Sequence, residues 1–328
     1  METGVSTSTE ANTDSPSPRE SKIKLGWIGI KKAVIRDKYL YLLLIPFIAY
    51  YIIFLYRPMY GLQIAFKDYS IFQGISESPW VGFENFIRFF ESDYFFRTLK
   101  NTVLISFYGL LFGFPAPIIL ALLFNEIRHK AYKSLTQTLT YLPHFISIVV
   151  VAGIVTNFLA PTNGLVNIII DKLGGDKTYF LTIPEYFRSI FVGMGIWKDI
   201  GFNAIIYIAA IAGISPHLYE AARMDGANRW QQVWNVTLPG IMPTIIILFI
   251  LNIGNFLEVG YEAIILLYQP ATYETADVIN TYVYRAGLQG GDYELGAAAG
   301  LFNAVIGLIL VVSANQLSRK YSQSGGLW

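Results

Sequence analysis

Six long runs of apolar residues, separated by shorter polar segments, dominate the 328-residue chain. Each run is about 20 residues long, enough for a helix to cross the roughly 30 Å hydrocarbon core of a bilayer. Only helices and closed barrels satisfy the backbone there, and these runs are too long and too continuously apolar for barrel strands. We therefore predict six transmembrane helices. They are placed at Tyr39–Tyr56, Asn101–Leu123, Leu139–Leu159, Ser189–Ala212, Ile241–Ile264 and Gly296–Leu317.

The composition agrees with an all-α integral membrane protein. Hydrophobic residues make up 54% of the chain and charged residues only 14%, whereas soluble domains carry about 25% charged residues. The chain has no cysteine, which excludes disulfides, thiolate metal sites, iron–sulfur clusters and a cysteine nucleophile. Its three histidines, His129, His144 and His217, lie far apart in sequence, so we expect no metal site.

The two ends of the chain differ from the apolar middle. Residues 1–20 are rich in Ser, Thr, Pro and Glu without apolar periodicity, which predicts a disordered tail. Residues 21–38 mix apolar and basic side chains, as in a helix on an anionic membrane surface; a basic linker is the alternative. Residues 39–317 form the predicted transmembrane domain, and residues 318–328 form a second tail.

The basic residues indicate the orientation of the helices. With the amino terminus inside, the inner segments carry 14 Lys and Arg residues and the longer outer segments carry 9. Cytoplasmic loops of membrane proteins carry such an excess. We therefore place both termini in the cytoplasm.

No sequence motif for catalysis or nucleotide binding is present. The chain lacks a G-x-x-x-x-G-K-[ST] phosphate loop, an H-E-x-x-H zinc motif and a G-x-S-x-G nucleophile elbow. We predict no catalytic residue. If the protein moves a solute uphill, we expect another chain to supply the energy.

The loop between the fourth and fifth predicted helices has a distinctive pattern. Ser215-Pro216 suits the start of a short helix, and Asp225-Gly226 should break it, because glycine accepts a left-handed turn cheaply. A second short helix should begin at Asn228 and end at Leu238-Pro239, just before the next span. The pattern predicts a cytoplasmic helix–turn–helix, with Glu220 as a fixed charge and two alanines that allow close approach of a partner.

These residues resemble the EAA loop of binding-protein-dependent ABC importer permeases. The family pattern of E-A-A, D-G-A and L-P stands here in one loop. WVGFENF at Trp80–Phe86, Asn101-Thr102, and YVYRAG at Tyr282–Gly287 followed by AAAG also look like sugar-importer permeases, of the oligosaccharide and polysaccharide type that includes alginate importers. The matching residues of the loop are Glu220, Ala221, Ala222, Asp225, Gly226, Ala227, Leu238 and Pro239.

The resemblance implies a type I ABC importer permease (MetI-like) in the bacterial plasma membrane. The coupling loop, residues 217–240, would dock on a cytoplasmic ATPase. A second permease subunit, two ATPase subunits and an extracytoplasmic solute-binding protein are the implied partners. ATP and magnesium would bind to the ATPases, leaving no cofactor in this chain. The implied cargo is a carbohydrate, with an anionic uronate polymer as one candidate.

Polar residues inside two predicted spans are candidates for a solute path. Ionisable groups at that depth are costly and usually face a cavity or a partner. In the fourth span Asp199, Asn203 and Tyr207 recur every four residues and share a helix face. Lys198 is adjacent, and it could pair with an acid or extend outward.

The fifth span carries a second polar face. At 100° per residue Asn252, Asn255, Glu258 and Glu262 fall within about a third of the helix circumference, and Gly254 and Gly260 interrupt the helix, as happens where helices unwind around a solute. Tyr207, Phe256 and Tyr261 could supply faces for a sugar ring. The alternative is that these groups hold helices together.

Further small features fit helix packing. Gly296–Gly300 is a run of small residues that permits close approach of helices, and Pro143-His144 should mark an irregularity in the third span. Two other functions stay open on the residues alone. Asp199, Glu258 and Glu262 could serve an ion-coupled secondary transporter, and a membrane-embedded enzyme is the weaker alternative.

Overall fold

A computed structural model of the chain describes residues 36–321. The predicted tail of residues 1–20, nearly all of the basic segment 21–38 and most of the tail 318–328 fall outside this range. Within it the chain is helical, and its one β feature is an isolated antiparallel bridge between Lys67 and Trp80. The predicted all-α class is confirmed.

The described part of the chain forms two units, one up to Tyr60 and one from Gly61 onward. The first unit consists of α2 (Lys38–Tyr50), η1 (Tyr51–Tyr56) and α3 (Arg57–Met59). Its large apolar side chains lie on all sides of the helix and are exposed. A helix that is apolar all round suits a lipid environment.

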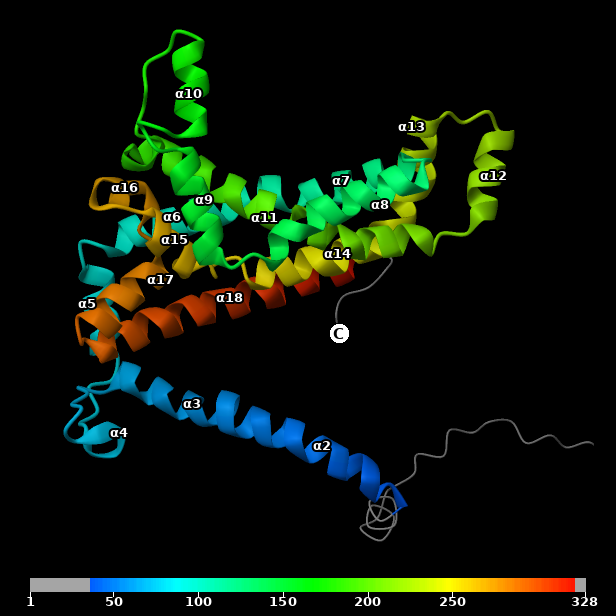
Figure 1. Ribbon diagram of the computed structural model, residues 1–328. Coiled ribbons are helices and arrows are strands. Elements are labelled where there is room, and N and C mark those ends of the chain that lie inside the picture. Colours follow the sequence, from blue (N-terminus) through cyan, green and yellow to red (C-terminus); the bar gives the residue numbers. More distant parts are fainter. Residues whose placement is uncertain (1–35, 322–328) are drawn as a thin grey trace, which may run out of the picture. The chain divides into compact units, whose positions relative to one another are not determined.

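The second unit holds the other long helical segments, which appear in chain order from cyan to red (Figure 1). They are α6 (Phe95–Tyr108), η3 (Gly109–Gly113) and α7 (Pro115–Glu126); α8 (Lys130–Tyr141), η4 (Leu142–Phe145) and α9 (Ile148–Phe158); α11 (Pro184–Ala212); α13 (Arg229–Gln232), η6 (Val233–Thr237) and α14 (Leu238–Gly254); and α18 (Tyr293–Tyr321). With the segment Lys38–Phe66, the described residues contain five apolar helices long enough to cross a membrane, or six when one bent pair counts as a span.

Shorter elements connect these segments. They are η2 (Tyr60–Phe66), α4 (Gly74–Glu77), α5 (Glu84–Glu91), α10 (Leu165–Lys172), η5 (Phe180–Thr182), α12 (Pro216–Met224), α15 (Tyr261–Leu267), η7 (Pro270–Thr272), α16 (Tyr273–Ala276), α17 (Ile279–Tyr282) and η8 (Val283–Gln289).

The third span is broken rather than straight. Its two halves, Lys130–Phe145 and Ile148–Phe158, meet at an angle of 104°. Pro143 lies inside the 3-10 turn η4, and Ser147 caps α9 by accepting a hydrogen bond from the backbone N–H of Val150. The irregularity predicted at Pro143-His144 is confirmed, whereas the continuous helix Leu139–Leu159 is wrong.

Helix α11 is the centre of the second unit. It packs against α7, α8 and α14, and also against the loop elements η4 and α16. Its Gly201 is buried against α8, where a side chain would collide with the backbone of Thr140. This close approach fixes α11 against the broken third span and so positions one wall of the site described below.

Helix α18 packs closely on η8. A Cβ atom on Gly296 would lie 2.8 Å from the Cα atom of Gly287, and Ala298 and Ala299 are fully buried. The small-residue run therefore packs helices within this chain, as predicted.

Candidate functional site

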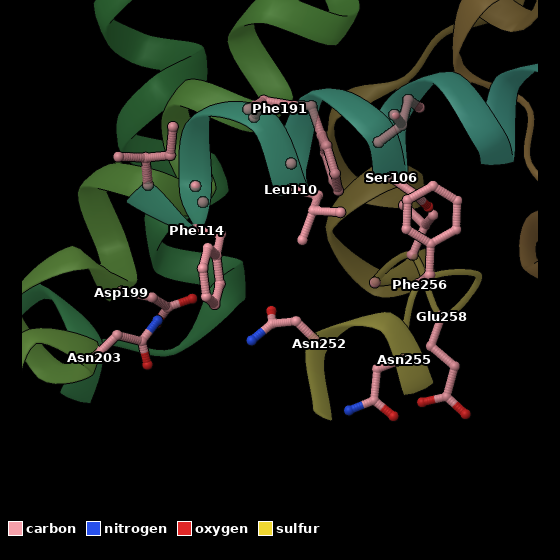
Figure 2. A pocket seen from close by; sticks show the side chains of 18 of the residues that line it. Ser106, Leu110, Phe114, Phe191, Asp199, Asn203, Asn252, Asn255, Phe256 and Glu258 are labelled. Carbon is pink, nitrogen blue, oxygen red and sulfur yellow. The ribbon is translucent and has the colours of Figure 1, made fainter. Parts of the chain in front are cut away.

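A cavity of about 290 Å³ lies between three segments of the second unit. Figure 2 shows Ser106, Leu110 and Phe114 on one segment and Asp199 and Asn203 on α11, with Asn252, Asn255, Phe256 and Glu258 on the third. The wall combines carboxylates and amides with aromatic and aliphatic faces. We call this space the central cavity.

The end of α14 supplies much of the polar wall. The helix stops at Gly254, and the backbone continues in turns. In these turns the backbone N–H of Asn255 donates to the Asn252 carbonyl at 3.2 Å, and the backbone N–H of Glu258 donates to the Asn255 carbonyl at 2.9 Å. A regular helix resumes only at Tyr261. The predicted interruption at Gly254 and Gly260 is confirmed, but the span does not continue as a helix to Ile264. Asn252, Asn255 and Glu258 line one cavity because the chain unwinds, not because they share a continuous helix face.

A polar cluster joins α11 to the break in the third span. His144 Nδ1 lies 2.8 Å from Asp199 Oδ1, and the His144 ring stacks on Phe202 with centroids 3.8 Å apart. Lys198 Nζ donates to the His144 carbonyl at 3.1 Å and lies 3.4 Å from Asp199 Oδ1. Lys198 therefore pairs with an acid, one of the two arrangements expected for it.

Two of the cavities that adjoin the central one hold the remaining candidate residues. A cavity of about 160 Å³ shares Asn203 and Asn252 with it and includes Tyr207, and a cavity of about 480 Å³ shares Asp199 and includes Lys198. Tyr261 and Glu262, at the start of α15, line the larger of these two.

All ten candidate path residues thus line one of three adjoining cavities. Tyr207 contributes least open surface, because it is 3% exposed and packs in an apolar cluster with Ala204 and Ile211. That a solute contacts these residues stays a prediction.

The loop after α11 forms the expected helix–turn–helix. Helix α12 begins with Pro216 and ends before Asp225, and Gly226 has a left-handed φ of +77°. The backbone N–H of Ala227 then donates to Ala222 O at 2.9 Å, and Asn228 and Gln231 cap α13 reciprocally. In Figure 1, α12 projects beyond the ends of α11 and α14.

The second helix of this loop does not end where the sequence suggested. Residues 229–254 form one continuous helical segment, with η6 leading directly into α14. Leu238 and Pro239 directly follow the π-helical turns of η6, so the hydrogen bond that Pro239 cannot donate falls at an irregular point of the helix. A force on α13 therefore acts on the fifth span through a helix rather than through a loop.

The surface of this loop is apolar and charged. Met224, Trp230 and Trp234 are 88%, 73% and 63% exposed, and the Glu220 side chain is 62% exposed. Arg229 forms an ion pair with Glu126 at the end of α7, and Tyr219 Oη lies 3.0 Å from Thr237 Oγ1. The Arg229–Glu126 pair holds the loop to the bundle and the Tyr219–Thr237 contact ties the loop together, while its outer face is exposed.

Sequence reasoning missed a buried polar knot around Asp277, a residue that is fully buried. Its carboxylate accepts hydrogen bonds from Arg97 and from both terminal nitrogens of Arg285, at 2.8–3.0 Å. These bonds raise the pKa of Arg285 above its ordinary value. Asn101 Nδ2 donates to the carbonyls of Glu274 and Asp277, and Arg188 Nη2 donates to Asn101 Oδ1 at 2.8 Å.

The knot joins α6, α11 and the segment after α15. Asn101 and Arg285 stood in the sequence only as parts of family-like motifs, and nothing in the periodicity pointed to Asp277. The available signal was one acidic residue among mainly apolar neighbours, in ADVIN.

Comparison with known proteins gives a consistent result. Residues 113–323 match the family described as binding-protein-dependent transport system inner membrane component. The chain is 44% identical to Protein LplB of Bacillus subtilis (strain 168) over 312 residues, covering 94% of this chain and 98% of the relative. It is 46% identical over 292 residues to the polygalacturonan/rhamnogalacturonan transport system permease protein YteP of the same organism, covering 89% and 91%.

Solved structures agree with these relatives. A chain of a bacterial ABC transporter involved in the import of the acidic polysaccharide alginate is 52% identical, with a TM-score of 0.84 over 90% of this chain and 99% of that chain. The same values hold for a structure of the alginate transporter in complex with a periplasmic protein that binds an alginate pentasaccharide. Fold and sequence similarity thus extend over nearly the whole chain.

Proposed function

The chain belongs to the family of binding-protein-dependent transport system inner membrane components, and on that premise we propose that it lines the path of an oligo- or polysaccharide through an ATP-driven importer. It is a multi-pass membrane protein and the permease subunit of an ABC importer. The saccharide and the path are our proposal. One observation carries them: the central cavity combines amide and carboxylate side chains with aromatic rings.

This combination suits a sugar. Hydroxyl groups need hydrogen-bonding partners, and a few polar groups in a mainly apolar wall fix the orientation of a ligand. Asn252, Asn255 and Glu258 supply such partners around the unwound end of α14, and Phe256 supplies a ring. The relatives named for polygalacturonan and alginate transport favour an acidic saccharide over a neutral one.

The coupling loop is proposed to receive the mechanical input. The exposed Glu220 and the alanines after it would enter a cleft of a cytoplasmic ATPase subunit. Because α13 continues into α14, movement of the loop would displace Asn252 and the turns that follow, and so change the cavity itself. We place the catalytic step, ATP and magnesium in two partner ATPases, and none of them in this chain.

The complete assembly would contain a second permease subunit and an extracytoplasmic solute-binding protein, in a bacterial plasma membrane. With both termini inside, the knot around Asp277 lies toward the outer face and the coupling loop on the cytoplasmic face. A solute released by the binding protein would therefore pass the knot before it reaches the central cavity.

Reconstitution tests the proposal. Proteoliposomes that hold this chain with its permease partner and ATPases should accumulate radiolabelled oligogalacturonate or alginate oligosaccharide only when binding protein and ATP are present. Vesicles with this chain alone serve as the control. Accumulation driven by an ion gradient in that control would favour the secondary transporter, and failure of the full assembly to take up any saccharide would refute the proposed cargo.

A further inference from the structure

A separate hollow of about 510 Å³ lies on α11, near its predicted outer end. Tyr108, Phe112 and Arg188 line it, together with the small residues Ser189 and Gly193. Val192 and Ile196 line both this hollow and the central cavity. We call it the arginine hollow. Its volume falls within the roughly 300–1,000 Å³ typical of small-molecule sites.

Arg188 brings an unused positive charge to this hollow. Of the three arginines in the knot, Arg97 and Arg285 are both paired with Asp277, whereas Arg188 has no carboxylate partner within residues 36–321. Its Nη2 donates to Asn101 Oδ1, and its buried Nε has no hydrogen-bond partner there. A guanidinium carries five N–H donors in a rigid fork; with Nε buried and one Nη2 donor bonded to Asn101, three donors on the Nη atoms are left for a ligand.

The knot holds this arginine in place. Both amide hydrogens of Asn101 are engaged, one by the Glu274 carbonyl and the other by the Asp277 carbonyl, so the Asn101 carbonyl oxygen has a fixed direction. Arg188 is therefore preorganised, and binding a ligand requires little further ordering of its side chain. Three guanidinium groups around one carboxylate leave the knot positively charged.

An aromatic surface lies beside the charge. Tyr108 and Phe112 are four residues apart and stack with centroids 6.4 Å apart and ring planes at 24°. Phe112 is 56% exposed, so one face of the pair is open. Opposite them, Gly193 has no heavy atom within 4 Å of where a Cβ would stand, which leaves room for a ring.

We infer that the arginine hollow binds a carboxylate-bearing sugar unit, with the sugar ring against Phe112 and its carboxylate on Arg188. Arginine and carboxylate pair through two parallel hydrogen bonds, which gives geometric selectivity as well as attraction. This inference rests on the proposed carbohydrate function and adds a location and a charge requirement to it. The hollow would select acidic units on their way to the central cavity.

The test uses two probes that differ only in charge: trigalacturonate and its fully methyl-esterified form. ATP-driven uptake of each is measured in proteoliposomes with the complete importer, for the wild type, Arg188→Gln, Arg188→Lys and Arg88→Gln. Arg88 pairs with Asp292 outside the hollow and serves as the control for loss of one arginine. Stimulation of ATP hydrolysis by the binding protein reports whether each assembly is intact.

We expect Arg188→Gln to lower trigalacturonate uptake by roughly tenfold or more, the loss typical of one charge-assisted hydrogen-bond pair, while uptake of the ester changes less than twofold. Arg188→Lys should fall between, and Arg88→Gln should affect both probes equally. Equal loss of both probes in Arg188→Gln, or no loss, would overturn the inference, as would a wild type that imports only the ester. If the wild type imports no saccharide, the proposed function fails first.

A second variant covers the case in which Arg188→Gln does not assemble. Phe112→Leu removes an exposed ring without opening the core, so the protein should fold. We expect it to lower uptake of both probes severalfold while ATP hydrolysis stays stimulated. Uptake of both at the wild-type rate would refute a binding role for the hollow.

Discussion

His144, which lies where the third span bends by 104°, places its Nδ1 atom 2.8 Å from Oδ1 of Asp199 on α11. The contact connects the break in that span to the α11 wall of the central cavity. Lys198 adds a second connection to the same break through the His144 carbonyl. The position of the bend and the shape of the cavity are therefore coupled through contacts of His144 with two neighbouring residues of α11.

This coupling predicts the behaviour of two variants of His144. His144→Leu removes the contact with Asp199, and we expect a loss of about 1 kcal/mol of stability, the usual contribution of one hydrogen bond, together with slower uptake. His144→Asn should be closer to the wild type, because its amide N–H can still donate to Asp199. Thermal unfolding in detergent and transport assays compare the two; equal behaviour would contradict a role for this contact.

The coupling loop predicts a separation of folding from transport. Glu220→Lys reverses an exposed charge, and Gly226→Pro is incompatible with a φ of +77°. Both changes are confined to the exposed loop, so we expect normal membrane insertion and loss of ATP-driven uptake. Uptake and copurification of the ATPase are the measurements.

Glu77→Lys is the matched control for the charge reversal, because Glu77 is also exposed but ends the short helix α4, far along the chain from the coupling loop. It should transport normally. Wild-type uptake in Glu220→Lys would contradict the proposed coupling role.

The same loop shows what the sequence alone could predict. The helix break at Gly226 follows from a local rule, since glycine adopts positive φ without strain. The transmembrane helices follow from the length of the apolar runs. The helix end predicted at Leu238-Pro239 was wrong because a continuing helix can carry a proline beside an irregular turn. Only the fold shows that η6 is such a turn and joins α13 to α14.

Long-range contacts were beyond sequence reasoning for a different reason. Arg97 and Asp277 are 180 residues apart, and no periodicity in either segment indicates that they meet. The polar residues of the spans could be predicted as candidates, because an ionisable group at bilayer depth is costly and usually faces a cavity or a partner. Which cavity each would line depends on how the helices pack.

Asn255 tests whether the central cavity is a solute path. Asn255→Leu removes a hydrogen-bonding group from the cavity wall and leaves the backbone hydrogen bonds of Asn255 in place. We expect uptake to fall by roughly tenfold, with ATPase coupling intact. Asn157→Leu is the matched control, since Asn157 is exposed on α9 and lines none of the cavities described above. An unchanged rate for Asn255→Leu would favour a role in helix packing.

Asp277 predicts a large effect on stability. Asp277→Asn leaves Arg97 and Arg285 without their shared carboxylate, and breaking such a buried pair costs about 3 kcal/mol. The ion pair between Arg88 and Asp292 is more exposed, so Asp292→Asn should lower the free energy of unfolding by less than about 1 kcal/mol. Thermal unfolding of the purified protein should rank them in this order, and the reverse order would contradict the structural role of the knot.

The contact between Gly296 and Gly287 predicts a steric effect that depends on position within one helix. In Gly296→Ala the new methyl group would meet the Gly287 Cα at 2.8 Å, so α18 must move away from η8, at roughly 1–3 kcal/mol for such overpacking. Gly300→Ala, one turn further on, meets no heavy atom within 4 Å and should be neutral or slightly stabilising, because alanine favours the helix. Comparing the yield and melting temperature of the two variants separates packing from helix propensity, since propensity favours alanine at both positions. Equal stability of the two variants would mean that α18 and η8 are not held together at this point.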